Sequence, residues 1–130
     1  MPPVIWPLHY RRPTIELSLP HVKSKYQRRL VADTGGRSDQ APFELLLREA
    51  DCEPYGFEVV AQVQLSGAYV GWFNVFSIAV RIPRLKFAES VLVVGVPKVP
   101  HGFDGIACFK FLNRFHYGNF GDRHHFGLEK

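Results

Sequence analysis

The sequence predicts a mostly β domain, and three observations support this fold class. Eleven Phe, five Tyr and two Trp accompany a single Met, and stiff aromatic side chains favour sheets over helical bundles. Residues 14–19 alternate between apolar and polar side chains, whereas residues 91–96 are a continuous apolar run, and both patterns are typical of strands. Residues 57–65 and 72–82 are two long strand-like segments joined by a turn that contains glycine, a pattern that predicts a projecting hairpin.

The chain divides into a short arm and one domain. Residues 1–13 contain four prolines, which are excluded from helix interiors, and are predicted to form an extended arm. Residues 14–130 are long enough to fold as one domain around a single core. No segment has the roughly twenty apolar residues of a membrane span, and the first residues lack the pattern of a signal peptide. We therefore expect a cytoplasmic protein without a membrane partner, in which Cys52 and Cys108 are reduced thiols.

The remaining elements follow from local patterns. An apolar strand ending at residues 29–32 runs directly into Asp33-Thr34-Gly35-Gly36, so an acid stands where a buried strand meets a tight turn. Apolar residues at positions 43, 46, 47 and 50 have the spacing of one helical face and predict a short helix over residues 42–50. A second short helix is expected within residues 106–114, and a closing hairpin within residues 115–128.

The order of these features resembles the retropepsin-like aspartic protease family, including its stand-alone bacterial members. The Asp33-Thr34-Gly35 loop, the long hairpin, and the late segment from Asp104 to Phe115 follow one another as in that family, over residues 14–128. The resemblance implies an acid-protease fold, which is a closed β-barrel with one or two short helices. It also implies a homodimer, because one chain supplies one catalytic acid whereas the chemistry needs two.

The resemblance assigns a role to each part of the loop and the hairpin. Asp33 of each protomer would be the catalytic acid that activates water to hydrolyse a peptide or protein substrate, without any cofactor. Thr34 would bond across the dimer axis, and Gly35 would let the backbone turn toward the carboxylates. The hairpin would be a flap that closes over the substrate. Its implied substrate-binding residues are Gly67, Tyr69, Gly71 and Trp72.

Three positions depart from the family pattern. Cys108 stands where the family has a glycine before the late helix, Lys110 where it often has Asp or Asn, and Gly36 replaces the usual Ala or Ser. The departures at Cys108 and Gly36 favour a second hypothesis, a catalytically silent dimer of the same fold that binds peptide or acts as a scaffold. A third interpretation is that Asp33 is only a turn acid whose side chain bonds local amides.

The net charge of +4 raises the question of nucleic acid as a partner. The densest group of cations, from Lys23 to Arg29, predicts a solvated strand end or turn. A nucleic-acid surface would require one face to be shared by Arg11, Arg12, Lys23, Lys25, Arg28 and Arg29. Nucleic acid is therefore the least favoured partner. The histidines at positions 101, 116, 124 and 125 lack the spacing of metal ligands, so no metal site is expected.

Overall fold

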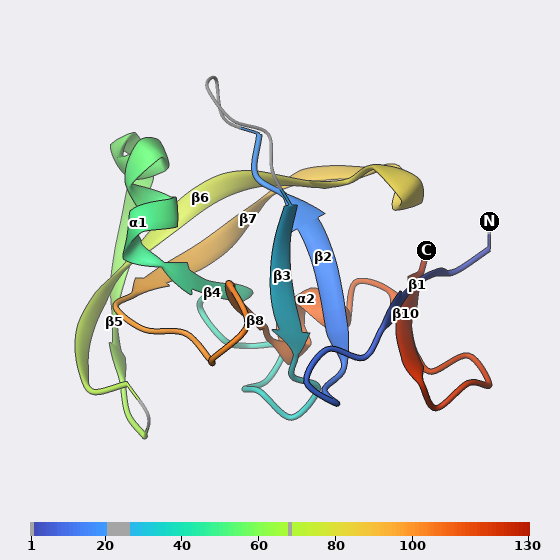
Figure 1. The fold of residues 1–130 in the computed structure, drawn as a ribbon. Helices are drawn as coiled ribbons and strands as arrows, with labels where there is room; N and C mark the ends of the chain where they lie inside the picture. The colour runs from blue at the N-terminus through green and yellow to red at the C-terminus, as the bar shows by residue number, and fades with distance from the viewer. Residues whose placement is uncertain (1, 21–26, 68) are drawn as a thin grey trace.

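A computed structural model describes residues 2–20, 27–67 and 69–130 of the chain (Figure 1). Most of the described residues in regular structure belong to strands and few belong to helices, so the predicted mostly β class is confirmed. In chain order the elements are β1 (Val4–Pro7), β2 (Thr14–Ser18), β3 (Gln27–Ala32), β4 (Leu45–Arg48), α1 (Glu49–Cys52), the 3-10 helix η1 (Glu53–Glu58), β5 (Val59–Leu65), β6 (Gly71–Ile82), the 3-10 helix η2 (Pro83–Leu85), β7 (Phe87–Val96), β8 (Gly105–Ala107), α2 (Phe109–Leu112), β9 (His116–Gly118) and β10 (His125–Glu129). None of the helices in the described ranges is long and apolar enough to cross a membrane.

Six strands form a closed barrel, as predicted. Their order is β2-β3-β8-β4-β7-β6, and the pairing of Ser18 on β2 with Arg81 on β6 closes the ring. Strand β5 extends the same sheet beyond β6 and therefore projects from the barrel. Side chains fill the interior, as is usual for a small barrel. The core includes the fully buried residues Ile15, Leu17, Leu30, Leu45, Leu47, Ile78 and Phe111.

Residues 42–50 do not form the predicted helix. Leu45–Arg48 is strand β4, which pairs in parallel with β7 and antiparallel with β8, and α1 begins only at Glu49. The three leucines of β4 are all buried because both faces of this central strand are covered. A short apolar run fits a buried strand as well as a helical face. The helix prediction was therefore wrong because pairing within the sheet, not local periodicity, decides the structure of this segment.

Strand β8 occupies the first part of the segment that was predicted as the second helix. Helix α2 begins only at Phe109, after β8 has passed between β3 and β4. Strand β8 is parallel to β3, and this register places Ala32 beside Ala107. Gly105 makes the close approach possible, since a Cβ added there would lie 2.2 Å from the carbonyl oxygen of Leu46.

We expect Gly105→Ala to lower the free energy of unfolding by about 2–3 kcal/mol, because the backbone atom that the added methyl meets cannot move aside. Urea denaturation would measure the change. Gly95→Ala is the matched control in the neighbouring strand β7. Its added Cβ would lie 3.3 Å from a ring carbon of Phe76, a side chain that can yield. Equal losses in the two variants would contradict the role assigned to Gly105.

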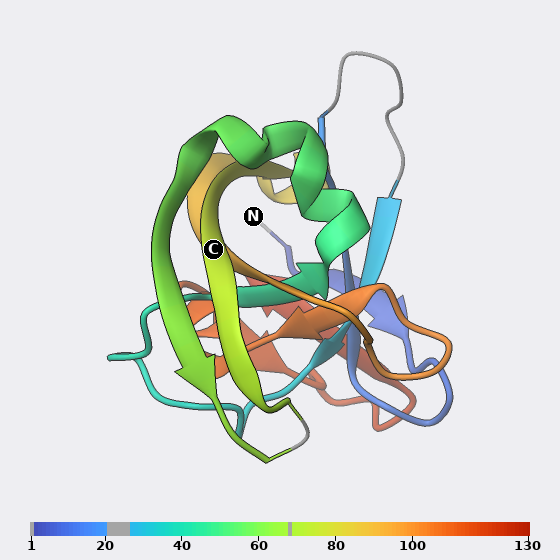
Figure 2. The ribbon, with the colours of Figure 1, turned by 90° about the vertical axis from the view of Figure 1, so that its left-hand side faces the viewer.

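The two ends of the chain form a second sheet with the order β1-β10-β9. Strand β1 pairs antiparallel with β10, and Trp6 lies opposite Phe126. Val4 and Trp6 are buried, so this part of the N-terminal segment belongs to the core. Strands β9 and β10 pair antiparallel and form the predicted closing hairpin. Figures 1 and 2 both show the two termini near each other.

Strands β5 and β6 form the predicted long hairpin. Gly67 and Gly71 in its turn have φ values of 76° and 124°, a conformation that side chains rarely adopt. Leu65 and Val75 of the hairpin pack with residues of the barrel wall, including Leu46. The hairpin curves along one side of the molecule, and in Figures 1 and 2 both its tip and the loop that follows β3 lie in the lower part of the view. The hairpin tip and the Asp33 loop therefore lie at the same end of the molecule.

Candidate active site

Asp33 lies where the chain leaves the barrel at the end of β3. Its amide donates to the carbonyl of Ala107 on β8 (2.9 Å), and the amide of Gly36 donates back to the carbonyl of Asp33 (3.0 Å). The amide of Phe109, the first residue of α2, donates to the carbonyl of Gly36 (3.0 Å). Backbone hydrogen bonds therefore hold the Asp33-Thr34-Gly35-Gly36 loop between β8 and α2.

The half-buried side chain of Asp33 folds over the backbone of the two glycines. A Cβ added to Gly36 would lie 2.8 Å from Asp33 Oδ2, so the absence of a side chain at Gly36 makes room for the carboxylate. Among residues 2–20, 27–67 and 69–130, no side chain or amide is hydrogen-bonded or ion-paired to this carboxylate. The amide bonds expected of a simple turn acid are thus not found in the described chain. Thr34 and Gly35 beside it are exposed.

Cys108 lies behind the loop as a buried thiol, as predicted. Its side chain is 2% exposed and packs in a cluster with Phe43 and residues of the hairpin. Burial raises the pKa of the Cys108 thiol to about 12, and the negative charge of Asp33 contributes in the same direction. The positive charge of Arg37 has the opposite effect on this pKa. The cluster thus accommodates the side chain that replaces the family's glycine.

Neither cysteine should react with a thiol reagent in the folded protein at about pH 8. Burial, reinforced by Asp51 and Glu49, also raises the pKa of Cys52 to about 12. The folded thiols keep their protons above the ordinary pKa of 9.0, so stability should be lost as the pH rises from 9.0 toward 12. Colorimetric titration with a disulfide reagent, with and without denaturant, checks the first expectation. Rapid labelling of the native protein would contradict it.

Tyr69 brings the hairpin tip to the same cluster. Its partly buried side chain packs against the residues around Cys108. Burial raises the pKa of Tyr69, and the Cys108 thiol raises it further. Of the implied flap residues, Tyr69 is therefore placed near the Asp33 loop, while Gly67 is exposed in the turn.

Trp72 lies outside this cluster. Its side chain is 66% exposed and lines a pocket of about 290 Å³ together with Glu49 and Glu53, beside α1. The next residue, Phe73, and its cross-strand partner Val63 pack against the Cys108 cluster instead. Sequence reasoning missed these two residues, because alternation separates the faces of a strand but does not tell which one is turned toward the loop.

Two polar contacts connect the segment before β4 with α2 and the residues that follow it, next to the Asp33 loop. Glu44 is 4% exposed, and its carboxylate accepts hydrogen bonds from Nε (2.5 Å) and Nη2 (2.9 Å) of Arg114. This hydrogen bonding raises the pKa of the Arg114 guanidinium. Lys110 Nζ donates to the carbonyl of Ala41 (2.7 Å), so the lysine that departs from the family pattern ties α2 to the loop before β4.

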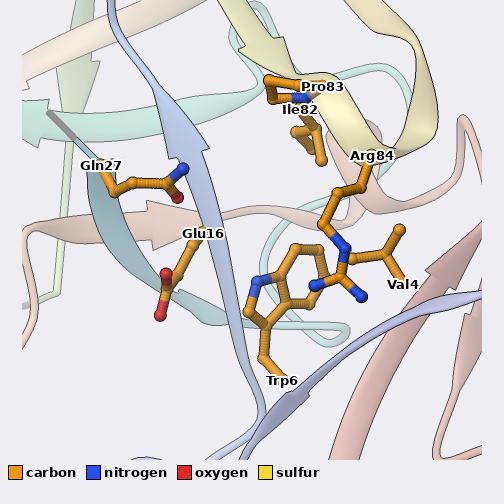
Figure 3. Close-up of a pocket in the computed structure, with 7 residues that line it drawn as sticks. All are labelled: Val4, Trp6, Glu16, Gln27, Ile82, Pro83 and Arg84. Carbon is orange, nitrogen blue, oxygen red and sulfur yellow. The ribbon is translucent and has the colours of Figure 1, made fainter. Parts of the chain in front are cut away.

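A second pocket shares no residue with the Asp33 loop. It lies between β1 and the barrel and has a volume of about 240 Å³ (Figure 3). Figure 3 shows the side chain of Arg84 extending beside Trp6 and Val4, with Glu16 and Gln27 on the other side. The pocket is smaller than the sites of drug-sized ligands. Among the described residues that line it, Glu16 supplies a carboxylate and Arg84 a guanidinium group.

The cations of the segment from Lys23 to Arg29 do not all share one face. Arg28 is buried and donates two hydrogen bonds to the carboxylate of Asp51, at 2.9 and 2.7 Å. Arg29, the next residue on β3, points to the opposite face and is exposed. Lys23 and Lys25 lie outside the described residues. Arg28 therefore does not lie on an exposed face shared with the other cations, as a nucleic-acid surface built from this segment would require.

No protein-family model, curated protein or solved structure matches this chain. Its function must therefore be argued from the site itself.

Proposed function

We propose that this chain is one half of a homodimeric, retropepsin-like aspartic endopeptidase. The observation that carries the proposal is the carboxylate of Asp33. It is half-buried at the end of a barrel strand, its loop is fixed by backbone hydrogen bonds, and within the described residues it has no partner. A carboxylate held in this way is available to a second carboxylate and to a water molecule.

The chemistry requires the Asp33 loops of two protomers to meet at a two-fold axis. Two carboxylates at hydrogen-bonding distance hold one proton between them, because placing two negative charges side by side is costly. The ionised partner would take a proton from water, which attacks the peptide carbonyl. The protonated partner would polarise that carbonyl and then help to protonate the leaving nitrogen. Water is the nucleophile, so the reaction needs no cofactor.

The exposed residues of the loop suit such an interface. Thr34 and Gly35 are exposed beside Asp33, and both would contact the loop of the partner copy. The hairpin tip would act as the flap, with Tyr69 next to the bound peptide and Phe73 of β6 packed against the same cluster. A lifted hairpin would admit the substrate, and its return would exclude water from the scissile bond.

The silent dimer of the same fold remains the second candidate, and Cys108 favours it. Its sulfur fills the space between the Asp33 loop and the hairpin cluster, where the family has only a hydrogen atom. Such a dimer would bind an extended peptide under the hairpin without cleaving it. The two candidates share a fold and an assembly, and they differ in whether a bound peptide is hydrolysed.

An unstructured protein such as casein, incubated with the full chain from about pH 4 to 7, tests the proposal. Cleavage that a hydroxyethylene transition-state mimic blocks is the expected result. Sedimentation equilibrium of the same sample would show whether the chain is dimeric. A stable dimer that binds the mimic and cleaves nothing across this range would support the silent candidate. A chain that stays monomeric and inactive would contradict both candidates.

A further inference from the structure

A strained turn precedes β2 on the outside of the barrel. His9 and Arg12 pair across it, with hydrogen bonds of 3.2 and 3.0 Å between their backbone groups. The two residues between them, Tyr10 and Arg11, have φ values of 50° and 61°. A two-residue turn of this kind favours Gly or Asn, because other residues are strained at positive φ. The turn therefore persists only because its surroundings hold it.

Contacts with the loop before β8 hold the turn in place. The ring of Tyr10 lies against Gly102, where an added Cβ would be 2.3 Å from Tyr10 Cε2. His9 Nε2 bonds the carbonyl of Gly102 (3.0 Å), and the His9 ring meets Phe103 edge to face at 5.2 Å between centroids. In Figure 2 the two loops, coloured blue and orange, lie on the same side of the molecule. As a result Tyr10 is 60% exposed yet fixed in position.

Guanidinium groups surround these rings. Arg12 lies over Phe103 at 5.8 Å, and Arg29 reaches the His9 ring at 3.2 Å. The two nearby carboxylates each form an ion pair, Glu16 with Arg29 (3.5 Å) and Asp104 with Arg48 (2.9 Å). Within the described ranges Arg11 and Arg12 form no ion pair. The surface made by Tyr10, Arg11, Arg12, Arg29 and His101, called the Tyr10 patch below, therefore carries excess positive charge.

We propose that the Tyr10 patch binds single-stranded nucleic acid. Bases would stack on the exposed rings of Tyr10 and His101, whose centroids are 5.8 Å apart, and phosphates would contact Arg11 and Arg12. Base stacking on aromatic side chains tolerates any sequence, and arginine suits phosphate oxygens. An acidic protein would use the arginines but has no need of two fixed, exposed rings. The proposal does not depend on protease activity at Asp33.

The test is fluorescence anisotropy of a labelled single strand of about twelve nucleotides, titrated with the full chain at several salt concentrations. Tyr10→Ala is expected to weaken binding about tenfold, while Tyr10→Phe, which keeps the ring, should retain it. Arg11→Ala with Arg12→Ala should reduce the slope of log affinity against log salt by about 0.7 for each phosphate that the double variant no longer binds. Arg81→Ala, which removes an exposed arginine of β6 outside the patch, is the control. Circular dichroism would confirm that each variant is folded.

Heparin, which carries charge but no bases, distinguishes the sources of binding. The proposal predicts that Tyr10→Ala weakens single-strand binding clearly more than it weakens heparin binding. Loss of affinity in the Arg11→Ala, Arg12→Ala double variant alone, with Tyr10→Ala unchanged for every ligand, would indicate a general polyanion surface and overturn the proposal. Absence of single-strand binding at low salt, or equal loss in Arg81→Ala, would overturn it as well.

Discussion

Asp33→Asn is expected to reduce peptide cleavage at least about a thousandfold, because an amide can neither accept a proton from water nor share one with its partner. Asparagine has nearly the shape of aspartate, and the Asp33 carboxylate forms no ion pair with the described residues that the change would break. The fold should therefore be retained. Initial rates with a fluorogenic peptide substrate would measure kcat/KM for the wild type and the variant.

Asp39→Asn is the matched control for this substitution. Asp39 is an exposed acid in the same loop region, six positions after Asp33. The control variant should keep wild-type activity, which would show that one missing negative charge near the loop is not enough to abolish cleavage. Cleavage by Asp33→Asn at a rate close to that of the wild type would remove Asp33 from the mechanism and leave the barrel without its proposed catalytic acid.

Arg114→Met is expected to lower the free energy of unfolding by about 3–5 kcal/mol, because it leaves the carboxylate of Glu44 buried without a cation. Glu44 is on the segment that leads into β4, and the carbonyl of the same residue accepts the amide of Cys108 (3.0 Å). Loss of the ion pair should therefore also loosen the packing behind the Asp33 loop. Urea denaturation followed by tryptophan fluorescence measures the change.

Two companion variants separate the buried charge from the mere loss of packing. Glu44→Gln combined with Arg114→Met removes both charges and should cost clearly less than Arg114→Met alone. Glu89→Gln removes the second, exposed partner of Arg114 and should change stability by no more than about 1 kcal/mol. If the single and double variants are equally destabilised, the cost does not come from an uncompensated charge at Glu44.

Elements with a strong local pattern were predictable from the sequence. The alternation in Thr14–Ser18 and the glycine-bearing turn between β5 and β6 led to the correct strands and hairpin. The helix prediction for the segment around β4 failed because the apolar residues at positions 43, 46, 47 and 50 have the spacing of a helical face, although the run of three leucines within them fits a buried strand equally well. The pairing of β8 with β3 and β4 decides the structure of this segment. It joins residues about 75 positions apart for β3 and about sixty for β4, and no local signal encodes it.

The surroundings of the candidate site were less predictable than its loop. The position of Asp33 at the end of an apolar strand followed from the residues before it. The ion pair of Glu44 with Arg114 did not, because the two residues are 70 positions apart. The Tyr10 patch was also missed. Arg28 and Arg29 were considered as one cluster, although neighbours on a strand point to opposite faces.

The central claim is that two Asp33 side chains form one active site across a two-fold axis. Wild-type and Asp33→Asn chains, mixed in equal amounts and allowed to exchange subunits, test this claim directly. If the site needs Asp33 from both protomers, only the wild-type homodimers are active, and these are about a quarter of the dimers. The mixture then shows about a quarter of the cleavage rate of a sample with the same total protein concentration that contains wild type alone. A rate of about half would mean that each wild-type chain acts alone, and it would contradict the shared site.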